Sequence, residues 1–204
     1  MRRHNAWGGP LLLLALVVVL GMVVRDGPAP GLDVQLLATI GQLSAKPLHQ
    51  NAMVWIYRLT GKGVQPLLVL AALGWLLARR RLNAAALLLA SCGGLFVWID
   101  LILKPWFGRA RPPAPLLNID GYSFPSGHAA GALVFAGTLA LLWCRARPGS
   151  QPTAWLLCGL WVAVVSWSAL VVGAHWPSDI AGGLLTGLAW LGLCLAVWRQ
   201  HARW

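Results

Sequence analysis

The stretch LNAAALLLASCGGLFVWIDLIL, Leu82–Leu103, decides the fold class of this chain. It carries a single charged side chain, Asp100. A helix crosses the hydrocarbon core of a bilayer with about 20 mostly apolar residues, and this stretch meets that length. It therefore predicts a transmembrane helix.

Five other apolar stretches approach the same length: Pro10–Val24, Val64–Ala78, His128–Trp143, Pro152–Val172 and Pro177–Trp198. Together the six predict an all-α fold, a six-span transmembrane helix bundle that forms a single domain over residues 1–204. The first stretch follows Arg2 and Arg3 and so resembles a signal peptide. Because Arg25-Asp26-Gly27-Pro28 follows it without a clear small-residue cleavage site, we expect the first span to be retained.

The composition agrees with a membrane protein. Hydrophobic residues make up 58% of the chain and charged residues only 10%, whereas soluble domains are about a quarter charged. The net charge of +11 would suit a nucleic-acid partner. The basic residues, however, sit in short clusters between the apolar runs, so we expect no nucleic-acid partner. The four cysteines lie inside apolar runs, where they act as small hydrophobic residues.

The basic residues also predict the orientation. Cytoplasmic loops carry an excess of Lys and Arg. With both termini in the cytoplasm, the cytoplasmic set is Arg2, Arg3, Arg79, Arg80, Arg81, Arg145, Arg147, Arg199 and Arg203. The loop from Arg25 to Gly63 then lies on the extracytoplasmic face, and its spaced apolar residues predict amphipathic helices in the membrane interface.

A first polar group, Lys104-Pro105-Trp106-Phe107-Gly108-Arg109-Ala110-Arg111-Pro112, lies on the same extracytoplasmic face. Three cations this close repel one another unless an anion sits among them. The planar fork of arginine suits phosphate oxygens, and lysine adds a compact charge. The alternative is a juxtamembrane cluster that binds lipid headgroups.

A second group, Tyr122-Ser123-Phe124-Pro125-Ser126-Gly127-His128, enters the fourth span. Ser126 and Gly127 lie near the expected helix N-terminus, where unpaired N–H groups attract anions. His128 is suited to donate a proton to a leaving oxygen. The alternative is a serine N-cap followed by an interfacial histidine.

A third group, Gly173-Ala174-His175-Trp176-Pro177-Ser178-Asp179, links the last two spans. His175 and Asp179 are four residues apart, so one helical turn would place them on one face. A carboxylate that holds one ring nitrogen leaves the other free to attack. The alternative is that Ser178 or Asp179 caps the last span beside a structural histidine.

The three groups together supply a phosphate clamp, a proton donor and an oriented nucleophile. A metal hydrolase would need more ligands than His128, His175 and Asp179, and Asp100 and Asp120 are poor additions to that set. The residues therefore predict phosphoryl transfer without a metal or other cofactor.

These groups resemble the signature of the type-2 phosphatidic acid phosphatase family of membrane lipid phosphatases. Lys104 with Arg111-Pro112 matches its first part, Pro125-Ser126-Gly127-His128 its second, and His175 with Asp179 the end of its third. The resemblance implies that His175 forms a phosphohistidine, that Asp179 orients it, and that His128 protonates the leaving group and then activates water. It further implies that the equatorial phosphate oxygens are held, without a metal ion, by Lys104, Arg111 and the backbone of Ser126 and Gly127.

One position departs from the family pattern. The third motif begins with Ser-Arg, separated by five residues from the histidine, whereas this chain has Ser168-Ala169. Loss of one charged donor costs on the order of 3 kcal/mol of transition-state stabilisation. We expect Arg109, two residues before Arg111, to replace it as a phosphate ligand.

The leading functional hypothesis is a bacterial inner-membrane hydrolase whose active site faces the periplasm. Its substrate would be a lipid phosphate or diphosphate of the polyprenyl diphosphate, phosphatidylglycerol phosphate, phosphatidic acid or lipid A type. The alternatives are a phosphotransferase between lipids and, because of Ala169, a non-catalytic lipid-phosphate binder. A vanadate-dependent haloperoxidase shares the resemblance, but the six apolar spans argue against that soluble class. Neither the lipid nor the oligomeric state follows from the sequence.

Overall fold

The computed structural model describes residues 6–25 and 29–201, and these ranges consist of helices, turns and loops without β-strands. Arg2, Arg3 and Arg203, which contribute to the predicted orientation, lie outside the described residues. So does the Asp26-Gly27-Pro28 segment at the questioned cleavage site. The predicted all-α fold class is confirmed for the described part of the chain.

Within the described ranges, five helices are long and apolar enough to cross a membrane. They are α1 (Gly8–Arg25), the continuous helix Leu82–Phe107, α8 (Gly127–Ala146), α9 (Gln151–Val171) and α10 (Pro177–His201). The stretch expected as the second span forms the shorter helix α4 (Gln65–Ala78), which has 14 residues. Since a helix rises 1.5 Å per residue, α4 covers about 21 Å of the roughly 30 Å hydrocarbon core. The six-span count thus stays a prediction.

The long helix Leu82–Phe107 is built from several segments. These are α5 (Leu82–Leu88), a π-helical stretch Leu89–Gly93, α6 (Gly94–Phe96), a second π-helical stretch Val97–Leu103, and α7 (Lys104–Phe107). Gly108 ends it with a left-handed φ of 63°, and its N–H donates to the Lys104 carbonyl over 2.9 Å. This turn suits glycine because it lacks a Cβ. It starts the loop that carries Arg109 and Arg111.

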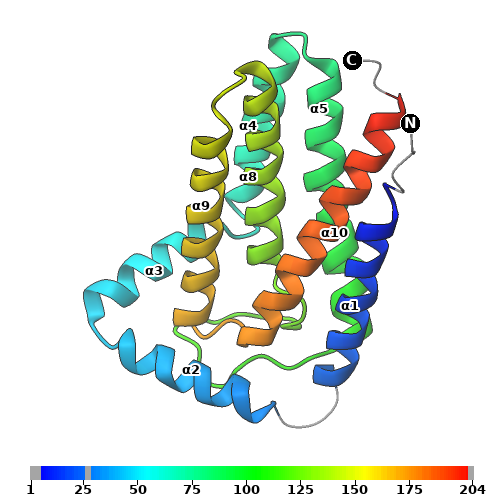
Figure 1. Ribbon diagram of the computed structural model, residues 1–204. Helices are drawn as coiled ribbons and strands as arrows, with labels where there is room; N and C mark the ends of the chain where they lie inside the picture. Colours follow the sequence, from blue (N-terminus) through cyan, green and yellow to red (C-terminus); the bar gives the residue numbers. More distant parts are fainter. Residues whose placement is uncertain (1–5, 26–28, 202–204) are drawn as a thin grey trace.

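Helix α8 is the centre of the bundle and packs against α9 and α10, while α1 packs on α10. The α8–α10 contact depends on two small residues one helical turn apart. A Cβ on Gly183 would stand 2.5 Å from the Ser126 carbonyl oxygen, and one on Gly187 would stand 3.2 Å from that of Ala130. Such small-residue pairs allow the backbones of membrane helices to approach closely. In Figure 1, α1 begins and α10 ends at the same end of the bundle.

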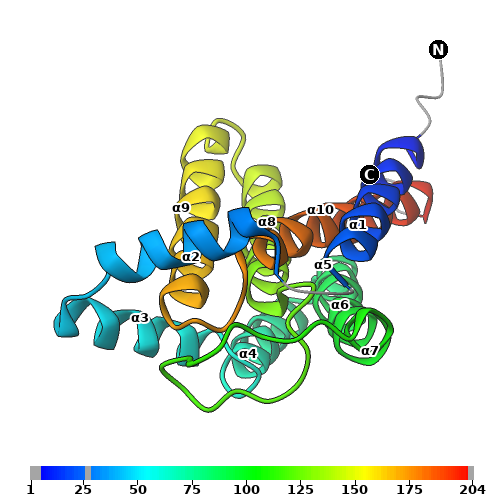
Figure 2. The ribbon, with the colours of Figure 1, turned by 90° about the horizontal axis from the view of Figure 1, so that it is seen from below.

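Helices α2 (Gly31–Leu43) and α3 (Pro47–Leu59) lie across the other end of the bundle (Figures 1 and 2). Helix α3 packs against α9, and α2 contacts both α9 and α10. The loop that was expected to hold amphipathic helices does contain two helices, whereas their location in a membrane interface stays a prediction. Both cover the end of the bundle at which the three polar groups lie.

Candidate active site

The three predicted polar groups meet at the end of the bundle that α2 and α3 cover. A cavity of about 1090 Å³ is lined there by members of all three, namely Lys104, Arg111, Gly127, His128 and His175. One side of the same cavity is apolar and runs between α4 and the Leu82–Phe107 helix, with Val69, Leu70, Leu89, Leu95 and Phe96 in its wall. The cavity thus combines a cationic end with a hydrocarbon-lined side.

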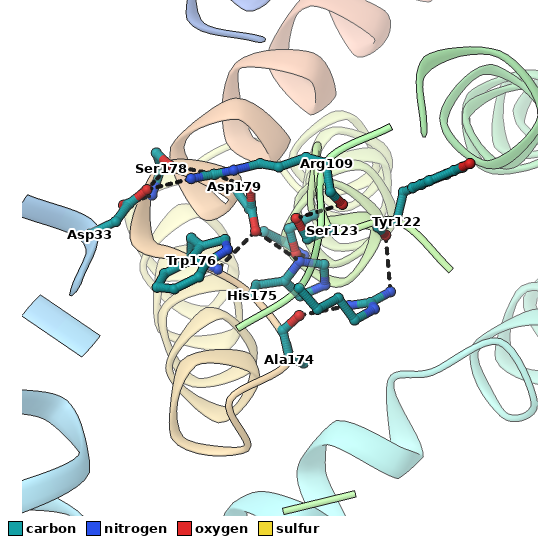
Figure 3. A network of polar contacts seen from close by, with 12 residues as sticks. Asp33, Arg109, Tyr122, Ser123, Ala174, His175, Trp176, Ser178 and Asp179 are labelled. Atoms are coloured by element: carbon teal, nitrogen blue, oxygen red, sulfur yellow. Dashed lines mark hydrogen bonds and ion pairs between the residues drawn. The ribbon is translucent and has the colours of Figure 1, made fainter. Parts of the chain in front are cut away.

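His175 lies in the link before α10 and is backed by Asp179 from the first turn of that helix (Figure 3). Its Nδ1 is 3.6 Å from Asp179 Oδ2, which is beyond hydrogen-bond length but close enough for the carboxylate to stabilise a positive charge on the ring. Both side chains are buried, with exposed fractions of 1% and 0%. Burial lowers the pKa of His175 below its ordinary value, against the opposing effect of Asp179. Lowering of the pKa favours the neutral ring, and with Nδ1 on the Asp179 side, Nε2 is the nitrogen free to act as a nucleophile.

Asp179 also performs the capping role that was the alternative for this motif. Its Oδ2 accepts a hydrogen bond of 2.8 Å from the Trp176 backbone N–H at the start of α10. The Asp179 carbonyl accepts from the Ser126 N–H over 3.0 Å, so the first turns of α10 and α8 are joined. Ser126 is the N-cap of α8, and its hydroxyl accepts from the Ala129 N–H. The helix start that presents Gly127 to the cavity is thus held by the backbone of the residue whose carboxylate lies behind His175.

The structure does not bring Arg109 to the cavity, in contrast to the phosphate-binding role expected for it. Arg109 is not among the described residues that line the cavity, and only 4% of its side chain is exposed. Its guanidinium donates to Asp179 Oδ1, to Ser178 Oγ over 2.8 Å and to Asp33 Oδ2 over 2.7 Å (Figure 3). The two carboxylates hold the guanidinium because a buried cation requires compensating charge. Arg109 therefore lies behind the site, on the far side of Asp179.

His128, the second residue of α8, is held by helix α3. Its ring stacks on Tyr57 with a centroid distance of 3.9 Å and an interplanar angle of 17°. Its Nε2 is 3.1 Å from the Tyr57 carbonyl oxygen. Because a carbonyl can only accept, Nε2 carries the proton in this contact. The His128 and His175 ring centroids are 6.3 Å apart, so both histidines face the same part of the cavity.

The cationic end of the cavity is partly neutralised by an acidic residue. Lys104 Nζ lies 2.9 Å from Asp100 Oδ1, one helical turn earlier, and Lys62 Nζ lies 2.7 Å from the same oxygen. Lys104 is nearly buried, whereas the side chain of Lys62 is 68% exposed. A single carboxylate thus holds two cations that would otherwise repel each other.

Arg111 is fixed by backbone carbonyls. Its guanidinium donates to the carbonyl oxygens of Ala174 over 2.7 Å, Gly121 over 3.0 Å, Tyr122 over 3.1 Å and Asp120 over 3.3 Å. Neutral acceptors leave its positive charge uncancelled. Arg111 is thus a rigid cation at the cavity wall, beside the loop that carries His175.

The model of the PAP2 superfamily matches residues 81–203 of the chain, which is more than half of its length. The chain belongs to the PAP2 superfamily. This confirms the resemblance found in the three motifs.

Two curated relatives and one solved structure extend the PAP2 comparison. A phosphatidylglycerophosphatase B from Bacillus subtilis strain 168 is 24% identical over 184 residues, covering 88% of this chain and 89% of that protein. A lipid A 1-phosphatase from Rhizobium johnstonii is 36% identical over 107 residues, covering 47% of this chain but only 40% of that protein. The crystal structure of a transmembrane PAP2 type phosphatidylglycerolphosphate phosphatase from Bacillus subtilis superimposes with a TM-score of 0.81 at 21% identity, covering 96% and 98% of the two chains. The fold is thus that of an integral membrane PAP2 protein.

Ala169 stands where the PAP2 motif has arginine, and apolar packing fills its surroundings. It is fully buried in a cluster with Tyr57, Ala129, Val172 and Ile180. Its carbonyl accepts the Ala174 N–H over 3.1 Å, which shapes the link before His175. The position therefore supports the fold of the site without adding a charge to it.

Several residues around the PAP2 motifs escaped sequence reasoning. Lys62 and Tyr57 come from the loop between the first two apolar stretches, and Asp33 comes from α2. Nothing in their local pattern distinguishes them from other polar residues of that loop. Asp100 carried a usable signal, because its spacing of four from Lys104 places both on one helix face.

Proposed function

We propose that this PAP2 protein is a membrane lipid phosphatase that removes the terminal phosphate of a lipid phosphate or diphosphate through a phosphohistidine at His175. One observation carries the proposal. His175, backed by buried Asp179, lines a cavity whose other walls hold His128, Lys104 and Arg111. Nucleophile, acid and cations therefore surround one space large enough for a phosphate group.

The proposed reaction has two steps. In the first, His175 Nε2 forms a bond to phosphorus while the bond from phosphorus to the lipid oxygen breaks. The departing oxygen takes the electron pair and a proton from the imidazolium form of His128, which is left neutral. In the second, neutral His128 takes a proton from water, whose oxygen bonds to phosphorus as the N–P bond breaks. Asp179 stabilises the positive charge that the His175 ring carries in between.

The phosphate oxygens are assigned to the cations at the cavity wall and to the N-terminus of α8, which Ser126 caps and where Gly127 lies. Lys104 and Arg111 are held in place by neighbouring groups, as preorganised donors must be. Lys62 supplies the additional charge that Ala169 does not. It lines the same cavity, shares Asp100 with Lys104, and is exposed enough to turn from that carboxylate to a substrate.

The apolar side of the cavity is assigned to the hydrocarbon chain of the substrate. The wall formed by α4 and the Leu82–Phe107 helix can shelter an acyl or prenyl chain, while the phosphate lies at the cationic end. The relatives named above are phosphatases of phosphatidylglycerol phosphate and of lipid A. Both lipids fit a cavity with a cationic end for phosphate and an apolar side for hydrocarbon chains. We place the protein in a bacterial inner membrane, with the site periplasmic and both termini cytoplasmic.

The test is release of inorganic phosphate from a panel of lipid phosphates and diphosphates by the purified full-length protein, with EDTA present. We expect activity that survives EDTA and is lost in His175→Ala. Trapping of acid-labile phosphate on the wild-type protein would identify the phosphohistidine. Phosphate found on a second lipid instead of in solution would favour the phosphotransferase, and substrate binding without turnover would favour the non-catalytic binder.

A further inference from the structure

We infer that Asp33, on helix α2, is a positioning residue that keeps Asp179 effective behind His175. The inference rests on the proposed function, because it assumes that His175 is the nucleophile. Asp33 lies outside the three PAP2 motifs and in a helix that precedes all of them. Its side chain reaches the site through Arg109 and the first turn of α10 (Figure 3).

The contacts form a closed buried network. Asp33 Oδ2 accepts from Arg109 Nη2 over 2.7 Å and from the Ser178 hydroxyl, and Asp33 Oδ1 accepts from the Ser178 backbone N–H over 2.9 Å. The other amino group of Arg109 reaches Asp179 Oδ1. Asp33, Arg109 and Asp179 are 3%, 4% and 0% exposed, so water screens their charges little.

The net charge of this network determines how strongly a positive charge on the His175 ring is stabilised. Two carboxylates surround one guanidinium, which leaves one net negative charge. If Arg109 faced Asp179 alone, the pair would be neutral, and Asp179 would lose most of its capacity to stabilise a positive His175 ring. Asp33 restores the missing negative charge. Arg109 can then fix the orientation of Asp179 without cancelling it.

A purely structural role for Asp33 predicts something different. In that role Asp33 would only fasten α2 to the start of α10 through Ser178, and its charge would not matter to the reaction. Ser178→Ala is the matched control, since it removes the hydroxyl from the same network and changes no charge. The charge role, in contrast, predicts an effect on the titration of His175.

The groups that face His175 set the direction of that effect. They are Asp179 behind the ring, His128 from α8, Lys104 and Arg111 across the cavity, and Arg109 and Asp33 beyond Asp179. Asp33→Asn removes a negative charge from this set, so protonated His175 becomes less favourable. The acid limb of the kcat/KM profile, which reports the base form of His175 in the free enzyme, moves to lower pH.

The experiment measures phosphate release at several pH values for wild type, Asp33→Asn, Ser178→Ala and His175→Ala of the full-length protein. We expect Asp33→Asn to lower kcat by roughly 10- to 100-fold, the loss found when a partner that orients a metal-bound imidazole is removed, because Asp33 acts on His175 in the same indirect way, through Arg109 and Asp179. KM should change little, and the acid limb should shift to lower pH. Ser178→Ala should leave the acid limb in place.

A double variant tests the charge balance a second time. Asp33→Asn with Arg109→Gln removes one charge of each sign, so Asp179 again supplies the net negative charge. Return of the acid limb to its wild-type position would support the inference.

The inference about Asp33 is overturned if the acid limb of kcat/KM does not move in Asp33→Asn. Equal losses of kcat in Asp33→Asn and Ser178→Ala, with no shift of the acid limb, would point to the purely structural role. If His175→Ala stays active, the proposed function itself fails, and the inference with it. If His175→Ala is inactive while Asp33→Asn behaves as wild type, only the inference fails.

Discussion

Arg109 provides a sharp test of the structure, because sequence and structure assign it different roles. As a phosphate ligand, Arg109 would matter only when substrate is bound. As a buried clamp between Asp33 and Asp179, it stabilises the protein whether or not substrate is present. The perturbation is Arg109→Gln, which keeps an amide donor and removes the charge.

The magnitude follows from the two ion pairs. A pair of unit charges about 4 Å apart interacts with about 4 kcal/mol at an effective dielectric constant of about 20, so two pairs contribute about 8 kcal/mol. Burying the ions offsets several kcal/mol of this. The remainder agrees with the roughly 3–5 kcal/mol by which loss of one partner destabilises a buried ion pair. We therefore expect a clear fall in the stability of Arg109→Gln.

The assay is thermal unfolding of the detergent-solubilised variant without substrate, followed by steady-state kinetics. Adding Asp33→Asn to Arg109→Gln should recover part of the lost stability, because it removes a carboxylate that no longer has its partner. A variant with wild-type thermal stability and a raised KM would refute this reasoning. It would restore the phosphate-ligand role that the sequence predicted.

Three further predictions concern the cavity, the helix packing and the pH dependence. Lys62→Met should raise KM about 10- to 100-fold, as expected for a lost charged hydrogen bond of about 1.5–3 kcal/mol, while Lys46→Met on the exposed surface should not. Gly183→Ala should cost about 1–3 kcal/mol of stability and lower the activity, because the added Cβ would meet the Ser126 carbonyl. Thermal unfolding measures the loss, and Gly159→Ala, which has open space around it, is the control. Because burial lowers the pKa of His175, its neutral form persists in mild acid, and the acid limb of kcat/KM should lie below about pH 6.5. An acid limb at or above that pH would contradict the burial of this ring.

The sequence by itself determined the class of fold and identified the three polar groups that meet at the cavity. Apolar runs such as Leu82–Leu103 identify membrane helices because a charged side chain in the hydrocarbon core is costly. A membrane-spanning segment is therefore visible as a long run with few charges. The spacing of His175 and Asp179 predicted their pairing because residues four apart share a helix face. The family motifs identified the remaining members of the cavity wall. All of these signals are local in the chain.

Only the tertiary structure decided how the charges around the site are paired. Arg109 meets Asp33 across 76 residues and Asp179 across 70, and His128 meets Tyr57 across 71. Partners at such separations depend on how α2 and α3 fold over the end of the bundle and on how the loop after Phe107 meets the start of α10, which no local pattern encodes. The two arginines of the first motif look alike in sequence. They differ in their surroundings because burial beside two carboxylates holds Arg109 behind Asp179, whereas backbone carbonyls hold Arg111 at the cavity with its charge available.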